Sequence, residues 1–346
     1  MTQPSSWPED DSWLVEESGF FPSDNLFDKA QFQAAYDAET TKTKRREALG
    51  RILNTGASRE LAVATPDIAE RLVEFEKRLA NAGAITRYIR RQIALSLLAE
   101  PPVIRWSPVL LDGPPGVGKT YFARALAEVL DVPLTIINCA SVTASFVLAG
   151  NSPSWSDSRP GKVLEALRDS RVANPIVLLD EVDKLHCDPR FDGYGPLYQL
   201  LEEDTARVFE DEHIGLPVNA SHILWLATSN DLKLLPEPIR SRFETLSMFK
   251  PSKGEVGAIA QSIYDNLLDG NRGWRNTFAA TLQLQVRNAI SGLPPREIRR
   301  VLTIGMGNAA MSRPGCKKIR LRLTDIELPN YQHDSGIGFL AGTGIS

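Results

Sequence analysis

The chain has 346 residues, of which 42% are hydrophobic and 24% are charged, and its formal net charge is −4. This length is sufficient for two domains with buried cores. The mild acidity argues against an extended surface for nucleic-acid phosphates, so we do not expect nucleic acid as a partner. No apolar run is long enough to cross a bilayer, and the three widely spaced cysteines outline no disulfide framework. We therefore expect a cytoplasmic protein that makes no contact with a membrane.

Residues 1–28 form an acidic segment that contains several large aromatic side chains. These are Trp7, Trp13, Phe20, Phe21 and Phe27. Acids, serines and prolines between them are typical of a segment that is disordered alone or docks on a partner. A strap packed on the main domain is the alternative, and the sequence leaves both interpretations open.

A helical extension is predicted for residues 29–100. Ile68, Leu72, Phe75 and Leu79 recur at steps of three and four residues, which is the spacing of one helix face. Pro66 stands where a helix is expected to begin. These helices lead into the next part of the chain.

Strands and helices alternate in residues 101–250. Strands are expected at 109–111, 134–138, 176–180, 223–228 and 245–249, and helices at 119–130, 160–172 and 194–204. The strand segments are continuously apolar, as in strands covered on both faces. This pattern predicts an α/β fold, a doubly wound parallel sheet.

A phosphate loop follows the first of these strands, because the motif G-x-x-x-x-G-K-[ST] is matched at every specified position. Its residues are Gly113, Pro114, Pro115, Gly116, Val117, Gly118, Lys119 and Thr120. Backbone N–H groups at a glycine-rich helix start form a positive site for phosphates. Lys119 adds a charge for the β- and γ-phosphates, and Thr120 offers a hydroxyl to Mg²⁺. The expected cofactors are ATP and Mg²⁺.

Polar residues end two further apolar strands. Asp180 ends the strand at 176–180 and Glu181 follows it directly, and Asn230 follows the strand at 223–228. Ligands of open α/β sheets bind at the carboxyl ends of the strands, so these side chains are expected to face the phosphate loop. Asp180 is predicted to hold Mg²⁺ through water, Glu181 to polarise the attacking water and Asn230 to orient it.

This set and order of motifs resembles the AAA+ ATPases, which are P-loop NTPases with a helical lid. The resemblance implies an AAA+ large domain at 101–250, a small helical lid at 251–314 and a tail at 315–346. Lid helices are expected at 256–268, 277–290 and 296–310. It also implies an arginine finger, Arg242 with Arg240 in reserve, which acts on the neighbouring subunit of a homo-oligomer, and a lid arginine that contacts the nucleotide. Candidates for the lid arginine are Arg296, Arg299 and Arg300.

Within that superfamily, residues 67–330 most resemble the ATPase module of Lon proteases. The matching stretches are Gly113–Thr120, Leu178–Leu185, Ala227–Asn230 and Arg159–Lys162. The resemblance implies that Trp155 lies on a loop lining the pore of a hexameric ring, and that residues 209–213 lie near a second such loop. Packing of Trp155 as core under the turn at 160–161 is the alternative. No Ser-Lys peptidase domain follows the lid, so proteolysis by this chain is not expected.

Three functions are compatible with these features. The first is an ATP-driven ring motor that unfolds or remodels protein substrates through its pore. The second is a regulatory or assembly chaperone of the MoxR type, which switches a partner without threading it. The third is a nucleic-acid-acting ATPase, which the charge balance disfavours.

Overall fold

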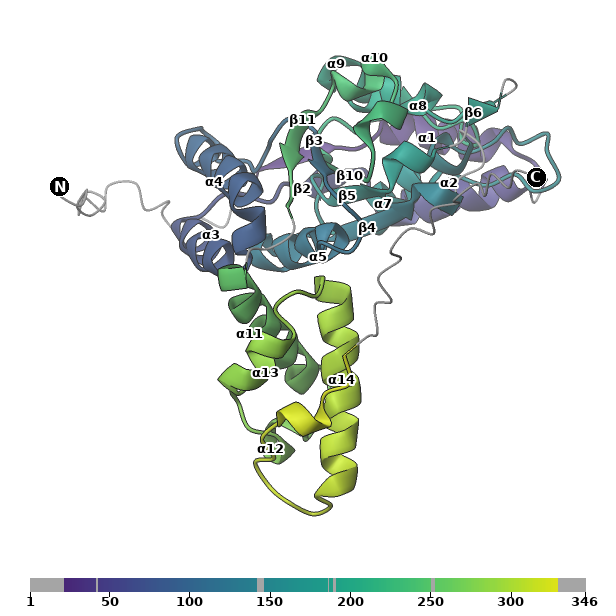
Figure 1. Ribbon diagram of the computed structural model, residues 1–346. Helices are drawn as coiled ribbons and strands as arrows, with labels where there is room; N and C mark the ends of the chain where they lie inside the picture. Colours follow the sequence, from purple (N-terminus) through teal and green to yellow (C-terminus); the bar gives the residue numbers. More distant parts are fainter. Residues whose placement is uncertain are drawn as a thin grey trace, which may run out of the picture.

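The computed structural model describes residues 22–41, 43–141, 146–185, 187–188, 191–249 and 253–328. Its centre is a five-stranded parallel sheet with strand order β11-β3-β10-β5-β4 (Figure 1). The strands are β3 (Val109–Asp112), β4 (Leu134–Asn138), β5 (Ile176–Asp180), β10 (Leu224–Ser229) and β11 (Glu244–Ser247). Strands were expected at each of these places, with bounds that differ by two residues at most.

Both faces of this sheet are buried, which explains why its strands are continuously apolar. In β5, Ile176 and Leu178 pack into the core on one face, and Val177 and Leu179 pack into the core on the other. Successive side chains of a strand point to opposite faces, so a strand covered twice has no position left for a polar residue. The fold is therefore the expected doubly wound sheet.

Helices cover both faces of the sheet, and helices from the first hundred residues contribute to each face. On one face lie α3 (Pro66–Arg78), α4 (Gly83–Leu97) and α5 (Lys119–Leu130). On the other lie α1 (Lys29–Ala38), α2 (Lys44–Asn54), α7 (Lys162–Asp169) and α8 (Gly195–Leu200). The N-terminal helices are thus built into the α/β core.

Short elements connect these layers. They are β1 (Ser23–Asn25), β2 (Ser58–Glu60), η2 (Ala80–Ala82), η3 (Cys139–Ser141), α6 (Phe146–Ala149), η4 (Val182–Lys184), β6 (Cys187–Asp188), β7 (Phe191–Asp192), α9 (Glu203–Ala206), β8 (Phe209–Glu210), β9 (Pro217–Val218), η5 (Leu232–Leu234) and α10 (Glu237–Arg240). The single helix expected at 194–204 is divided into α8 and α9, because Glu202 between them has an extended backbone (φ −111°, ψ 126°).

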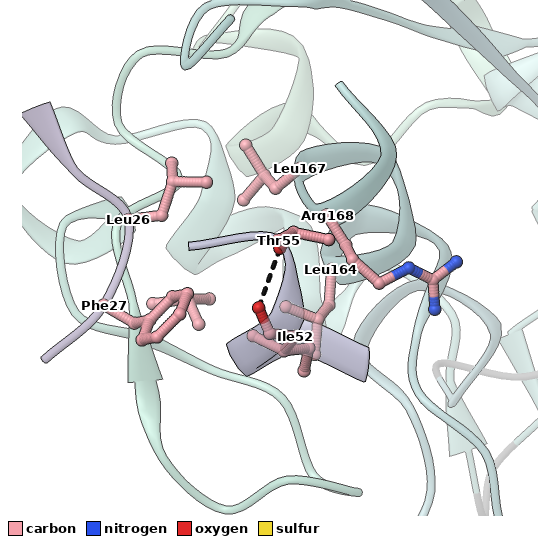
Figure 2. A pocket seen from close by; sticks show the side chains of 8 residues that line it. Leu26, Phe27, Ile52, Thr55, Leu164, Leu167 and Arg168 are labelled. Atoms are coloured by element: carbon pink, nitrogen blue, oxygen red, sulfur yellow. Dashed lines mark hydrogen bonds between the residues drawn. The ribbon is translucent and has the colours of Figure 1, made fainter. Parts of the chain in front are cut away.

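The described residues 22–28 form a strap on the α/β core. Strand β1 pairs antiparallel with β2, and Leu26 and Phe27 are buried. Figure 2 shows these two side chains beside Ile52 of α2 and Leu164 and Leu167 of α7, around a small apolar gap. This part of the segment therefore packs on the main domain, as the strap interpretation requires.

The other aromatic residues of the acidic segment, Trp7, Trp13, Phe20 and Phe21, lie outside the described residues. The docking interpretation of residues 1–21 thus stays a prediction.

The lid is a separate helical unit with its own core (Figure 1). Its elements are α11 (Lys253–Asp269), α12 (Trp274–Thr277), α13 (Leu284–Ala289), α14 (Pro295–Ser312) and η6 (Leu323–Asp325). The helix expected at 277–290 is interrupted, because the chain at Phe278 is extended and bridges to Ile319. Ile319 and Leu321 are buried in the lid core, so the lid continues past residue 314, where it was expected to end.

In the described parts of the chain, no helix is both long and apolar enough to span a bilayer.

The strap should contribute measurably to stability. Phe27 is 6% exposed, and its ring centroid lies 4.3 Å from that of Phe32. We expect Phe27→Ala to lower the free energy of unfolding by about 3–5 kcal/mol, the range for truncating a buried aromatic residue. Chemical denaturation would measure this change. Leu98→Ala, at a position that is 86% exposed, is the control and should change stability little; an equally stable Phe27→Ala protein would contradict the strap.

Candidate nucleotide site

The parallel register brings the carboxyl ends of the central strands to one edge of the sheet. Asp112 of β3 is level with Ser229 of β10, and Asn138 of β4 is level with Asp180 of β5. The segments that follow these strands therefore meet at this edge, where ligands of open α/β sheets bind.

The phosphate loop depends on two glycines for its path. Gly118, the residue before α5, has φ 103°, which is a left-handed conformation. At Gly113 a Cβ atom would lie 2.2 Å from the carbonyl oxygen of Met248, so no larger residue fits. The loop can therefore turn tightly and deliver its N–H groups to the start of α5.

Lys119 lies at the centre of the site. Its Nζ donates to the carbonyl oxygens of Gly113 and Pro114, at 2.5 Å and 3.1 Å, and to Oδ1 of Asn230 at 2.9 Å. Burial lowers the pKa of Lys119, while the carboxylates at the strand ends oppose this shift. The ammonium is thus held by oxygens of the loop and of the segment after β10.

Asp180 forms a compact group with two threonines. The Thr120 hydroxyl donates to Oδ1 of Asp180 at 3.0 Å, and the Thr228 hydroxyl donates to the same oxygen at 2.7 Å. A hydroxyl and a carboxylate side by side are the oxygen ligands that Mg²⁺ accepts, with nucleotide phosphates and water completing its shell. The predicted pair, Thr120 and Asp180, therefore fits this cation.

Glu181 is placed by its backbone as well as its side chain. Its φ and ψ are 57° and 51°, a left-handed conformation that is rare outside glycine. The backbone N–H of Glu181 donates to Oγ1 of Thr228 at 2.8 Å, and Nδ2 of Asn230 lies 3.5 Å from Oε1 of Glu181. Asn230 thus lies between Lys119 and Glu181.

Thr228 is a residue of this site that the sequence analysis did not assign. It is buried, and its hydroxyl connects Asp180 to the backbone of Glu181. The signal available in the sequence was its place two residues before Asn230, at the end of an apolar strand.

Arg242 lies apart from this group, beyond the short helix α10. Its Nε is 3.0 Å from Oε1 of Glu202, and its guanidinium lies 5.4 Å from the ring centroid of Tyr198. The reserve candidate Arg240 pairs with Glu237 on its own helix. The structure therefore does not place either arginine at the phosphate loop of its own chain, and a role in trans stays a prediction.

The lid approaches the phosphate loop at the start of α14. A Cβ atom added at Gly116 would lie 3.8 Å from Cβ of Pro294. Arg296 belongs to the first turn of α14 and is exposed, as are Arg299 and Arg300 one turn later. Arg296 is thus nearest in sequence to this approach, and the choice among the three stays a prediction.

Trp155 lies on a polar loop away from the core. Its side chain is 50% exposed, and its ring centroid lies 6.4 Å from that of Phe146. The alternative that it is an ordinary core residue does not hold. Placement at a pore stays a prediction.

A buried carboxylate anchors the base of this loop. Asp211, after β8, accepts backbone N–H bonds from Gly161 at 2.7 Å, His213 at 3.0 Å and Ile214 at 3.2 Å. Burial raises the pKa of Asp211 to about 6 against the effect of these donors. His213 is also hydrogen-bonded to the Ser158 hydroxyl. Hydrogen bonds at Ser158 and Gly161 therefore join the end of the Trp155 loop to the segment 209–214.

The Thr228 hydroxyl offers a direct test of the site. Thr228→Val keeps the side-chain shape but removes a donor to Asp180 and the acceptor for the Glu181 N–H. We expect stability to fall by about 1–3 kcal/mol, the cost of leaving a buried polar group unpaired, and ATP turnover to fall about tenfold or more. Steady-state ATPase assays and thermal melts would measure both. Thr277→Val removes a hydroxyl that donates to the carbonyl oxygen of Gly273 in the lid and is the control; normal turnover by Thr228→Val would exclude the proposed role.

Comparison with known proteins agrees with this arrangement. Residues 109–251 match the family described as "ATPase family associated with various cellular activities (AAA)". Lon protease 4 of Sorangium cellulosum (strain So ce56) is 37% identical over 150 residues, which are 43% of this chain and 19% of that protein. The peroxisomal Lon protease homolog 2 of Pichia angusta is 38% identical over 141 residues, 40% of this chain and 15% of that protein. The chain thus spans less than a fifth of the length of either relative.

Solved structures show the same fold at low sequence identity. The S. cerevisiae Hsp104-ADP complex matches with a TM-score of 0.55 and 15% identity, over 77% of this chain and 44% of that one. A closed state of Hsp104 with ATPyS and FITC casein matches with a TM-score of 0.57 and 15% identity, over 71% and 48%. The family match includes all five strands of the sheet and the residues gathered at their ends. The chain therefore carries an ATPase domain of the AAA family, one that resembles the Lon proteases.

Proposed function

We propose that this protein is a ring-forming motor, with a hexamer as the expected size, which hydrolyses ATP to unfold or remodel protein substrates through a central pore. The observation that carries the proposal is Trp155, a large apolar side chain that is half exposed on a polar loop fixed at its base. An indole presented in this way can grip a polypeptide through apolar area without reading its sequence. The AAA domain supplies the energy source.

The residues at the strand ends suggest how hydrolysis proceeds. When ATP binds, Lys119 would exchange its carbonyl partners for phosphate oxygens. Thr120 and Asp180 would hold Mg²⁺, which supplies positive charge beside the β- and γ-phosphates. Glu181 would polarise the attacking water, and Asn230, between Glu181 and Lys119, would orient it. Arg242 of a neighbouring subunit would stabilise charge on the γ-phosphate as the bond breaks.

The joined loop bases support coupling of this chemistry to a substrate. Asp211 ties the Trp155 loop to the segment that precedes β10, and β10 leads to Thr228 and Asn230. A change in conformation at the nucleotide site would therefore reach the Trp155 loop through β10 and the segment that precedes it. The path runs through packed backbone and not through a flexible linker.

Binding and hydrolysis should separate in two variants. Glu181→Gln should keep ATP affinity and ring formation, while ATP turnover falls by roughly two orders of magnitude, the scale of a lost general base. Lys119→Ala should lose nucleotide affinity, because it removes the cation of the phosphate loop. Nucleotide-binding titrations beside steady-state ATPase assays would measure this difference. Near-normal turnover by Glu181→Gln would show that another group activates the water.

The Trp155 side chain tests remodelling itself. Trp155→Ala should leave stability nearly unchanged, because the side chain is half exposed, and leave ATP hydrolysis within a few-fold of normal. Unfolding of a tagged reporter protein should be lost, and Trp155→Tyr should retain most of it because a large aromatic surface remains. Full unfolding activity of Trp155→Ala would show that Trp155 does not grip the substrate, whereas a parent protein that hydrolyses ATP but unfolds no reporter would favour a partner-switching chaperone.

A further inference from the structure

Three groups from separate elements surround the guanidinium of Arg242. The carboxylate of Glu202, between α8 and α9, lies 3.0 Å from Nε. The carbonyl oxygen of Pro238 on α10 accepts a hydrogen bond from Nη1. The ring of Tyr198 on α8 lies under the guanidinium, 5.4 Å from ring centroid to Cζ. The arginine is thus held by an ion pair, a hydrogen bond and a cation–π contact.

We propose that Glu202 is a positioning residue, which fixes Arg242 in the orientation required to meet the γ-phosphate of ATP on the neighbouring subunit. The proposal rests on the proposed function, in which Arg242 acts in trans. Glu202 itself would not touch the nucleotide. Its effect would pass through Arg242 alone.

Donor chemistry is compatible with this role. A guanidinium carries five N–H donors in one plane. One of them, on Nη1, donates to the carbonyl oxygen of Pro238, and the contact of Nε with Glu202 is an ion pair without a hydrogen bond, so donors remain for a third partner. The planar group can therefore stay fixed on one side and bind phosphate oxygens on the other.

The supports are rigid although the ion pair is at the surface. Leu197 and Leu200 of α8 and Ile239 of α10 are fully or almost fully buried, so the elements that carry Tyr198 and Pro238 are fixed by the core. The Arg242 side chain is 26% exposed and that of Glu202 is 52% exposed. An ion pair this exposed adds little to folding stability. Removal of this ion pair should therefore lower kcat and leave the melting temperature unchanged.

Orienting the arginine in advance matters because its side chain is long. A free arginine loses much of its rotamer freedom when it binds a phosphate. If Glu202 has already restricted it, less freedom is lost when the γ-phosphate arrives. Such preorganisation acts on the chemical step, where charge spreads over the phosphoryl oxygens. The competing possibility is that Glu202 withdraws Arg242 from the phosphate, in which case its removal would accelerate hydrolysis.

The first experiment compares ATPase kinetics of the full chain in four variants: Glu202→Gln, Glu203→Gln, Arg242→Ala and the double variant Glu202→Gln/Arg242→Ala. Glu203→Gln is the matched control, because Glu203 is the adjacent acid and pairs with Arg207 at 2.6 Å. We expect Glu202→Gln to lower kcat roughly three- to tenfold, with KM for ATP within twofold and an unchanged melting temperature. Glu203→Gln should behave as the parent protein. The double variant should be no slower than Arg242→Ala.

A mixing experiment then locates the effect on one subunit. Arg242→Ala subunits mixed with Glu181→Gln subunits should regain some activity, at interfaces that pair an intact Glu181 with an intact Arg242. Glu202→Gln added to the Glu181→Gln subunit, which supplies the arginine, should lower the regained activity by the same three- to tenfold. The same change in the Arg242→Ala subunit should leave it unaltered. A purely structural role of Glu202 would not distinguish the two subunits.

Several results would overturn the proposal. The first is an unchanged or higher kcat for Glu202→Gln. The second is a double variant whose kcat is roughly three- to tenfold below that of Arg242→Ala alone. The third is an equal effect of Glu202→Gln in either subunit of the mixture. Normal turnover by Arg242→Ala would overturn both this proposal and the assignment of the finger. If mixing restores nothing, the arrangement in trans fails by itself, and the double variant still decides whether Glu202 acts through Arg242.

Discussion

Parallel pairing of β3, β10 and β5 is the constraint on which the candidate site depends. Because all strands run in one direction, the segments after Asp112, Ser229 and Asp180 leave the sheet at the same edge. The phosphate loop, the two acids and the asparagine therefore converge, and hydrogen bonds from Lys119 to Asn230 and from Thr120 to Asp180 join them. The Thr228 hydroxyl then fixes the spacing between Asp180 and the strained backbone of Glu181, so one hydrogen-bonded side chain sets the geometry that hydrolysis would use.

Local patterns predicted the sheet well, because strands buried on both faces carry a continuous apolar signal. The wrong predictions concern segments whose conformation depends on contacts with residues far away in the sequence. The segment 277–290 reads as one helix, yet Phe278 is extended because Ile319, 41 residues later, bridges to it. The same contact extends the lid beyond its expected end at residue 314. The break at Glu202 likewise has no local marker such as proline or glycine.

For the site, motif spacing predicted the residues that stand next to strand ends, and these do come together. Motif spacing could not predict residues whose roles depend on contacts that form only in the folded chain. Asp211 binds the N–H of Gly161, fifty residues earlier, and Glu202 faces Arg242, forty residues later. A lone acid in a sequence gives no sign of such a partner. The role of Arg242 depends on contacts with a second subunit, so it stays a prediction.

The strap at 22–28 also determines where the first residues of the chain are attached. The backbone N–H of Leu61 donates a hydrogen bond to the carbonyl oxygen of Pro22. The backbone N–H of Ala173, three residues before β5 begins, donates to the carbonyl oxygen of the adjacent Glu60. This is the amino end of the strand, whereas Asp180 is at its carboxyl end. The strap is thus anchored at the amino end of β5, and the candidate nucleotide site lies at the opposite end of the same strand.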